Sequence, residues 1–203
     1  MPNPPSLENE FVRLEPLTPE HSEPLLAIVD EDLWAGMVTP LPTGIQRMSA
    51  HIGGLLADPN RSSFVVIDQL TGGLLGSTCL YDYVPAQARV ELGNTFYARS
   101  VWGGPTNPAC KLLLFEHAFN QLGVHRVALR CDTRNVRSIA AIQKLGAIYE
   151  GTLRGHRIAA DGTTSDTKYF SVLATEWPGV RRDLQARLVA LGTGNTSAGP
   201  VSV

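Results

Sequence analysis

The spacing of apolar residues changes from a strand pattern to a helix pattern near residue 100. Residues Arg89–Tyr97 alternate between two faces, as the side chains of a strand do. After the cap-like pair Asn107-Pro108 the pattern becomes helical, with a stripe formed by Leu112, Phe115, Phe119 and Leu122. A compact apolar strand, Val127–Cys131, follows. A strand, a helix and a strand in this order predict a crossover, with a parallel pair wherever the two strands are neighbours.

The other segments complete a mixed α/β domain. Further strands are predicted over residues 11–14, 63–68, 74–83, 147–156 and 167–174, and further helices over 19–29, 45–57, 136–145 and 176–191. Residues 34–44 contain two prolines and two glycines and are predicted to form a loop. We therefore expect one domain over residues 9–191 with a twisted, mostly antiparallel, seven-stranded sheet flanked by helices. Residues 1–8 are expected to be flexible and residues 192–203 to form a disordered tail.

Charge and cysteine usage exclude several classes of function. A net charge of −2 with a pI of about 6.2 gives no footprint for nucleic acid or for an anionic membrane. No run is long enough to cross a bilayer, and the N-terminus lacks the features of a signal peptide. Cys79, Cys110 and Cys131 lie far apart inside apolar runs, so reduced, packed thiols are expected instead of disulfides or zinc ligands. The sequence predicts a cytoplasmic protein without a metal, nucleic-acid or membrane partner.

A glycine-containing segment, Arg99–Asn107, joins the strand to the following helix. Gly103 and Gly104 allow close approach of a ligand to the backbone, and the helix N-terminus presents free N–H groups with partial positive charge. Such a segment can bind a pyrophosphate, although a Gly-Gly pair before a helix is more often only a turn.

The second half of the chain contains a series of different short motifs at a characteristic spacing. They are Trp102-Gly103, Ala118-Phe119, Leu122-Gly123, Arg126-Val127, Asn135-Val136-Arg137-Ser138, Lys144-Leu145-Gly146-Ala147, Glu150-Gly151, Leu153-Arg154 and Glu176-Trp177. In these motifs the chain resembles the GNAT superfamily, and within it the branch of the ribosomal-protein-alanine N-acetyltransferases (the RimJ/RimL type). The order of the predicted strands and helices over residues 9–191 matches the same superfamily.

The resemblance implies acetyl-CoA as co-substrate and a primary amine as acceptor. The branch favours a protein N-terminal α-amine, whose pKa of about 8 makes it a better nucleophile near neutral pH than a lysine, with a pKa of about 10.4. A small-molecule amine is the nearest alternative acceptor. The alternative to an enzyme is a regulatory module that binds acyl-CoA without catalysis. A homodimer is left open by the resemblance.

The resemblance also implies a cofactor site, with one departure from the family pattern. The pyrophosphate loop of the family reads Gln/Arg-x-x-Gly-x-Gly/Ala, which falls here on Ser100, Gly103 and Pro105, or one residue earlier on Arg99, Trp102 and Gly104. Because Pro105 has no N–H, the phosphates would depend on neighbouring N–H groups. The implied cofactor-binding residues are Arg99, Trp102, Gly103, Gly104, Thr106, Asn107, Asn135 and Arg137.

Two residues are candidates for proton transfer. Glu91 stands in mid-strand, where Glu is disfavoured and where GNAT enzymes often place a catalytic carboxylate, so it is the candidate base. Alternatively, Glu91 only occupies a solvated face of the strand, or a chain of water molecules acts as the base. Ser138 takes the place of a proposed proton donor near the thiol, or serves only in helix capping with Asn135. The acceptor side is expected to involve Trp34, Met37, Tyr81, Tyr83 and His156.

Overall fold

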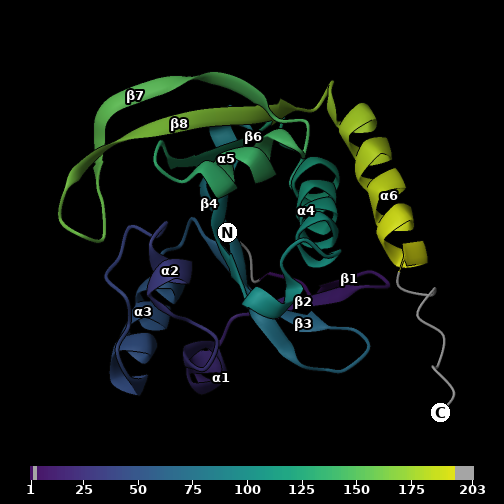
Figure 1. Ribbon diagram of the computed structural model, residues 1–203. Helices are drawn as coiled ribbons and strands as arrows, with labels where there is room; N and C mark the ends of the chain where they lie inside the picture. The colour runs from purple at the N-terminus through teal and green to yellow at the C-terminus, as the bar shows by residue number, and fades with distance from the viewer. Residues whose placement is uncertain (2–3, 195–203) are drawn as a thin grey trace, which may run out of the picture.

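One open sheet organises the molecule (Figure 1). The computed structural model describes Met1 and residues 4–194. The sheet has eight strands in the order β1-β2-β3-β4-β5-β6-β8-β7, and among these pairings β5 with β6 is parallel and the others are antiparallel. The strands are β1 (Leu7–Glu8), β2 (Val12–Pro16), β3 (Ser62–Asp68), β4 (Leu74–Val84), β5 (Arg89–Tyr97), β6 (Arg126–Asp132), β7 (Ile148–Ile158) and β8 (Thr164–Leu173). The predicted mixed, mostly antiparallel sheet and its parallel pair are confirmed.

The strand count differs from the prediction by one. Leu7 pairs with Leu14 and Glu8 with Arg13, so β1 forms within the segment that was expected to be flexible. Two residues show no detectable alternation, which is why the sequence pattern did not predict this strand.

The predicted helices lie close to their expected positions, and one further short helix, over Glu31–Trp34, was not predicted. They are α1 (Ser22–Leu26, after the 3₁₀ turn Pro19–His21), α2 (Glu31–Trp34), α3 (Ile45–Leu56), α4 (Thr106–Glu116, continued by a π-helical turn, His117–Gln121), α5 (Val136–Gln143) and α6 (Trp177–Gly194). Shorter 3₁₀ turns cover Pro85–Gln87 and Arg99–Val101. The helix α6 extends through residues 192–194, where the sequence predicted the tail, and residues 195–203 lie outside the described part of the chain.

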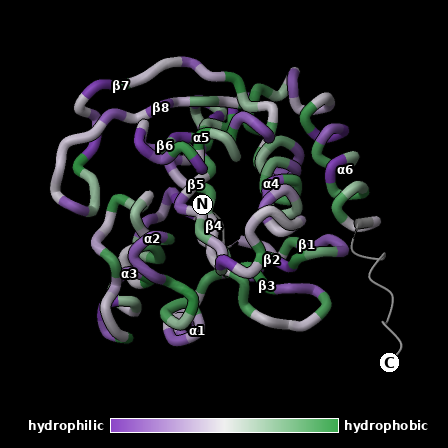
Figure 2. The backbone as a smooth tube through the Cα atoms, in the orientation of Figure 1, coloured by the Kyte–Doolittle hydropathy of each residue, from purple (hydrophilic) through white to green (hydrophobic). Residues whose placement is uncertain are grey.

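Two apolar clusters cover the two faces of the sheet. Phe64 and Val66 of β3 belong to a core shared with α4, α5 and α6, whereas Val65 and Ile67 belong to a second core shared with α1, α2 and α3. Adjacent residues of one strand point to opposite faces, so the two groups of helices lie on opposite sides of the sheet. Along α6 hydrophobic and hydrophilic residues alternate, as expected for a helix with one buried side (Figure 2).

The parallel pair β5–β6 is short. It runs only from Arg89 opposite Arg126 to Glu91 opposite Ala128. Beyond this point β5 stays paired with β4, and β6 stays paired with β8. The two strands therefore separate in the middle of the sheet.

Candidate active site

A cavity of about 550 Å³ lies where β5 and β6 separate. Its walls include Leu92–Tyr97 of β5 and Leu129–Cys131 of β6, the residues that follow the last residues of the parallel pair. Residues of α2, α4 and α5 and of the β7–β8 hairpin also line it. The cavity is thus built by the topology of the sheet.

The β5 wall contains a β-bulge. Cys79 pairs with Gly93 and Ser77 with Phe96, so that Thr78 alone faces both Asn94 and Thr95. Asn94 takes a left-handed backbone conformation, with φ 47°. Bulges often aim backbone and side chains at an active site, and this one turns Asn94 and Thr95 toward the cavity wall.

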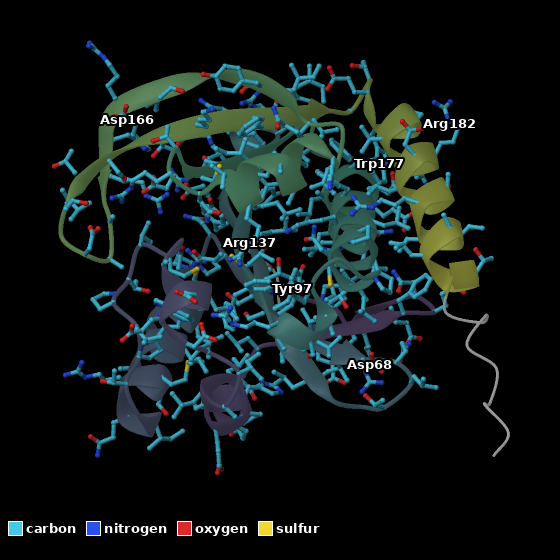
Figure 3. The ribbon with its side chains drawn as sticks, in the orientation of Figure 1. Asp68, Tyr97, Arg137, Asp166, Trp177 and Arg182 are labelled. Atoms are coloured by element: carbon cyan, nitrogen blue, oxygen red, sulfur yellow. The ribbon has the colours of Figure 1, made fainter. Side chains whose placement is uncertain are left out.

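The rim near α4 brings together several residues of the predicted cofactor site. Trp102, Gly103 and Asn107 line the cavity, and the Trp102 indole N–H donates to the Tyr97 carbonyl at 2.8 Å. The Arg137 guanidinium lies over the Trp102 ring, 3.9 Å from its centroid. Arg137 and Tyr97 both lie near the middle of the molecule (Figure 3). Gly103 has φ 80°, and no atom lies within 4 Å of the position a Cβ would occupy, so its backbone is open to a ligand.

Three residues predicted to bind the cofactor do not line the cavity: Arg99, Gly104 and Thr106. Arg99 is held by Asp30 at 2.7 Å and by Asp32 at 3.0 Å, and these two carboxylates balance its charge. The Gly104 N–H donates to the Val101 carbonyl at 3.3 Å, so it is already satisfied within the loop.

The first turn of α4 has fewer free N–H groups than expected. Pro105 is the N-cap and Pro108 the third helical residue, and neither has an N–H to donate. Thr106 and Asn107 therefore supply the N–H groups of this turn that remain for an anion.

Asn135 forms the N-cap of α5 at the other rim of the cavity. Its Oδ1 accepts the Ser138 N–H at 2.9 Å, as the capping alternative predicted. A Cβ on Gly36 would come within 2.2 Å of the Asn135 Nδ2, so the glycine lets the loop after α2 pass directly over this amide. Asn135 and Ser138 both line the cavity, and burial raises the pKa of the Cys131 thiol while the nearby Ser138 acts in the opposite direction.

Glu91 lies behind the cavity wall on the face covered by α1–α3. Val90 and Leu92 point into the other core, so Glu91 points away from it, and its side chain is only 8% exposed. Its Oε2 lies 3.0 Å from the Arg130 Nε, but that N–H donates to the Tyr81 hydroxyl at 3.2 Å, and Oε2 is left without a hydrogen bond. Burial raises the pKa of Glu91, while Arg130 and a hydrogen bond from Tyr81 act in the opposite direction.

Glu91 borders a second, smaller cavity. This cavity shares Asp82 and Arg130 with the main cavity. Tyr81 lines the main cavity, so its hydroxyl connects Glu91 with that space.

Three of the five residues expected on the acceptor side line the main cavity: Met37, Tyr81 and His156. Trp34 does not, because it is a core residue that packs against Phe96 and donates its indole N–H to the Thr39 carbonyl at 2.8 Å. Tyr83 is also absent from the lining, although it packs against the larger core.

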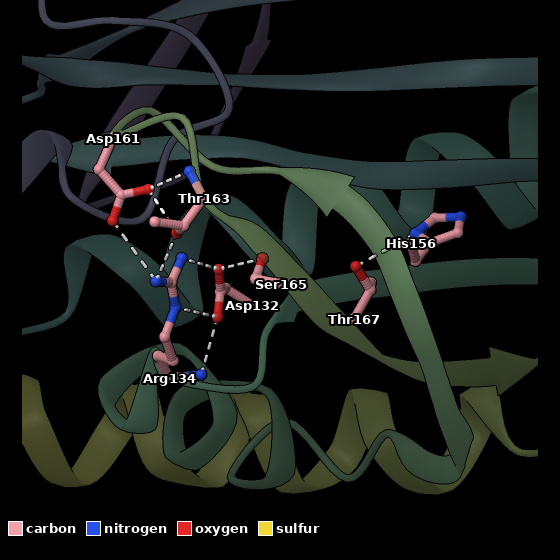
Figure 4. Close-up of polar contacts among 7 residues, drawn as sticks. All are labelled: Asp132, Arg134, His156, Asp161, Thr163, Ser165 and Thr167. Carbon is pink, nitrogen blue, oxygen red and sulfur yellow. Dashed lines mark hydrogen bonds and ion pairs between the residues drawn. The ribbon is translucent and has the colours of Figure 1, made fainter.

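The β7–β8 hairpin bends strongly toward its loop end (Figure 1). His156 of β7 and Thr167 of β8 line the cavity, with Nδ1 and Oγ1 3.1 Å apart (Figure 4). The hairpin loop is tied to the end of β6 through Arg134, which binds Asp132 at 2.9 Å and Asp161 at 3.4 Å. Asp132 also accepts from Ser165 at 2.7 Å.

Positive charge dominates the cavity wall. Arg130 and Arg137 line it together with Arg61, Lys111 and Arg157, whereas Asp82 is the carboxylate among the lining residues. Sequence reasoning missed Lys111, although a lysine inside the apolar run Ala109–Leu114 was a detectable signal. It also missed Gly36 and Arg61, for which loop and strand-end positions gave no signal.

The acetyltransferase (GNAT) domain family matches residues 12–148. The chain belongs to this family. Among solved structures, an acetyltransferase of T. thermophilus, so described only provisionally, is 36% identical, with a TM-score of 0.84 over 91% of this chain and 97% of that one. YdaF of Bacillus subtilis, provisionally named a ribosomal N-acetyltransferase, is 29% identical over 53% of this chain.

The match to YdaF spans 58% of that protein's length. Two structures of lower identity share the fold and contain CoA. Mycobacterium smegmatis RimJ in complex with CoA-disulfide is 21% identical with a TM-score of 0.75, over 90% of this chain and 93% of that one. The spermidine N-acetyltransferase of Vibrio cholerae with CoA and spermine is 16% identical with a TM-score of 0.71, over 84% of this chain and 99% of that one.

No helix in residues 4–194 is long and apolar enough to cross a membrane. The same residues contain no group of three or more His, Cys, Asp or Glu side chains placed to hold a metal ion. Cys79, Cys110 and Cys131 are free and buried, as predicted.

Proposed function

We propose that this protein transfers the acetyl group of acetyl-CoA to the α-amine at the N-terminus of a polypeptide. The observation that carries the proposal is the cavity at the separation of β5 and β6, which joins a cationic rim at α4 and α5 to a proton-accepting carboxylate behind Tyr81. Family membership supplies the reaction class, and the RimJ and YdaF names support the polypeptide acceptor.

The residues of the rim fit an acyl-CoA. Arg137 presents a cation on the Trp102 ring, Gly103 has open backbone, and Asn107 offers its N–H at the start of α4. The Asn135 amide borders the path between the two strands, where a pantetheine arm would pass. When bound, acetyl-CoA supplies the activated acetyl thioester; this chain orients the amine and handles its proton.

Glu91 is proposed to accept the proton of the acceptor amine. The Glu91 Oε2 is buried, forms an ion pair with Arg130 and accepts no hydrogen bond, and an unsatisfied buried polar group of this kind is one mark of a catalytic site. Burial raises the pKa of Glu91 toward neutral pH. A general base is most effective when its pKa lies near the pH at which the enzyme works. Tyr81 connects it to the cavity, so the proton would pass through the phenol or a water beside it.

Ser138 is proposed to donate a proton to the departing thiolate. Its backbone N–H is fixed by Asn135, which holds the start of α5 against the cavity. The position one turn later is Ile142, which cannot donate, so α5 offers the Ser138 hydroxyl at this wall.

The charge of the cavity favours a polypeptide N-terminus over a polyamine as acceptor. A polyamine carries several positive charges and would need carboxylates, whereas this cavity is lined by five Arg and Lys side chains and by Asp82. A peptide N-terminus brings one amine, which is neutral when it reacts, and amide groups that tolerate a cationic wall.

Two measurements test this proposal. Calorimetric titration should give micromolar binding of acetyl-CoA, and release of free thiol should then be strongest with peptides that have a free N-terminus. Absence of binding at millimolar ligand would contradict the cofactor site. Thiol release with spermidine and not with any peptide would assign the protein to small-molecule acetylation.

A further inference from the structure

Lys111 is a buried amine in the wall of the main cavity. It lies on the inner side of α4 and is 5% exposed, and it is one of only three lysines in the chain. Its Nζ donates to the Thr95 Oγ1 at 2.9 Å, at the β-bulge of β5. No described carboxylate forms an ion pair with it. Burial of an unpaired ammonium is costly, so this lysine has no evident role in stability.

The surroundings of Lys111 favour its neutral form. Burial lowers the pKa of Lys111 to about 8, close to the value of an α-amine. The titratable groups that act on its charge are the Cys110 thiol on α4 and the Cys79 thiol on β4, and the Tyr97 phenol on β5 lines the same cavity. Burial raises the pKa of Cys79 to about 11 and of Cys110 to about 12 and also raises that of Tyr97, so none supplies a negative charge near neutral pH. Arg61, in the same wall, adds a cation.

We propose that Lys111 is a self-acetylation site, modified by the acetyl-CoA bound in its own cavity. The inference rests on the proposed function, because it requires the thioester to enter the space that Lys111 lines. The neutral amine forms an Nζ–C bond to the acetyl carbonyl while the C–S bond breaks. One amine proton leaves with the sulfur to give free CoA, and the other remains on the amide. The product places an acetylated side chain at Thr95.

The full-length protein and isotopically labelled acetyl-CoA, without any acceptor, provide the test. Peptide mass spectrometry resolves all three lysines, of which Lys144 is exposed and Lys168 half-buried. We expect label at Lys111 to approach one acetyl group per chain, at least tenfold faster than at Lys144 or Lys168. Labelling of Lys111 should accelerate as the pH rises through about 8, since the amine reacts after losing its proton.

Two controls separate this reaction from chemical acetylation. Acetyl phosphate, which lacks the CoA moiety, should label Lys144 and Lys168 before the buried Lys111. Lys111→Met should retain the fold and bind acetyl-CoA, and show only the slow background at the other two lysines.

The inference is overturned if acetyl-CoA binds by calorimetry but Lys111 is labelled no faster than Lys144. Failure of acetyl-CoA to bind would instead overturn the proposed function, and the inference with it.

Discussion

At the scale of single residues, Glu91 is distinguished by an oxygen that is buried but not hydrogen-bonded. If it is the base, Glu91→Gln should lower the turnover rate by about 10²- to 10⁴-fold, the usual contribution of a general base. Affinity for acetyl-CoA should stay the same, because Glu91 lies on the far side of the wall. Glu150→Gln is the matched control on the edge strand β7, where Arg126 holds the carboxylate, and should turn over normally. Equal turnover in the wild type and Glu91→Gln would exclude the base role.

Two arginines, Arg99 and Arg137, were predicted equally from the sequence to bind the cofactor, and their surroundings in the structure differ. Both lie over Trp102, but Arg137 lines the cavity whereas Arg99 is neutralised by Asp30 and Asp32. Losing a charged contact to a phosphate costs roughly 1.5–3 kcal/mol, so Arg137→Met should weaken CoA binding by about 10- to 100-fold. Arg99→Met should change it much less. Calorimetric titration of both variants with CoA decides this, and the opposite order would return Arg99 to the cofactor site.

At the scale of elements, the β7–β8 hairpin depends on a polar cluster at the end of β6. Asp132 is almost buried and holds Arg134 and Ser165 (Figure 4). Asp132→Ala leaves both without this partner and should lower the free energy of unfolding by about 2 kcal/mol, as measured with urea. The KM for the acceptor should rise more than the Kd for CoA, because the hairpin carries His156 and Thr167.

This contribution of Asp132 to stability depends on pH. Hydrogen bonds from Arg134 lower the pKa of Asp132 well below its usual range. The pKa of this carboxyl is lower in the folded protein than in the unfolded chain, where it is about 3.9. Ionised Asp132 therefore stabilises the fold at any pH above about 3.9, and this stabilisation is lost as the pH falls from there toward the folded-state pKa. The difference between the wild type and Asp132→Ala should therefore shrink in acid. Asp183→Ala, at an exposed position of α6, should match the wild type at every pH.

At the scale of the whole molecule, the family match ends at residue 148, but the sheet does not. Strand β8 lies between β6 and β7, and α6 packs on α4 and the π-helical turn after it through Trp177, which is tilted against Phe115 and stacked on Phe119. Trp177→Ala should lower the free energy of unfolding by about 3–5 kcal/mol. Val189→Ala, on the exposed side of α6, should change it by less than about 0.5 kcal/mol. Because α6 does not line the cavity, the folded Trp177→Ala protein should bind CoA normally; weakened binding would contradict this separation.

The sequence predicted the architecture more completely than the site. Periodicity, apolar runs and turn residues located seven of the eight strands: Arg89–Tyr97 alternates in sequence, whereas Ser62–Asp68 is a short run that is buried almost throughout. The side chains that occupy the cavity depend on where distant elements meet. Asp30 and Asp32 hold Arg99 across about 70 residues of sequence, and Gly36 passes over Asn135 across about 100. Such contacts follow from the packing of distant segments, which a local sequence pattern does not contain.

The central claim is acetyl transfer to a polypeptide α-amine, and the position of the acetyl group in a product tests it most directly. The substrate is a peptide with a free N-terminus and one internal lysine, and its N-terminally blocked twin is the control. Fragment mass spectra should place one acetyl group on the α-amine, leave the blocked peptide unmodified, and show almost no product with Glu91→Gln. Acetylation of the lysine in both peptides, or of neither peptide while a polyamine is consumed, would contradict the account.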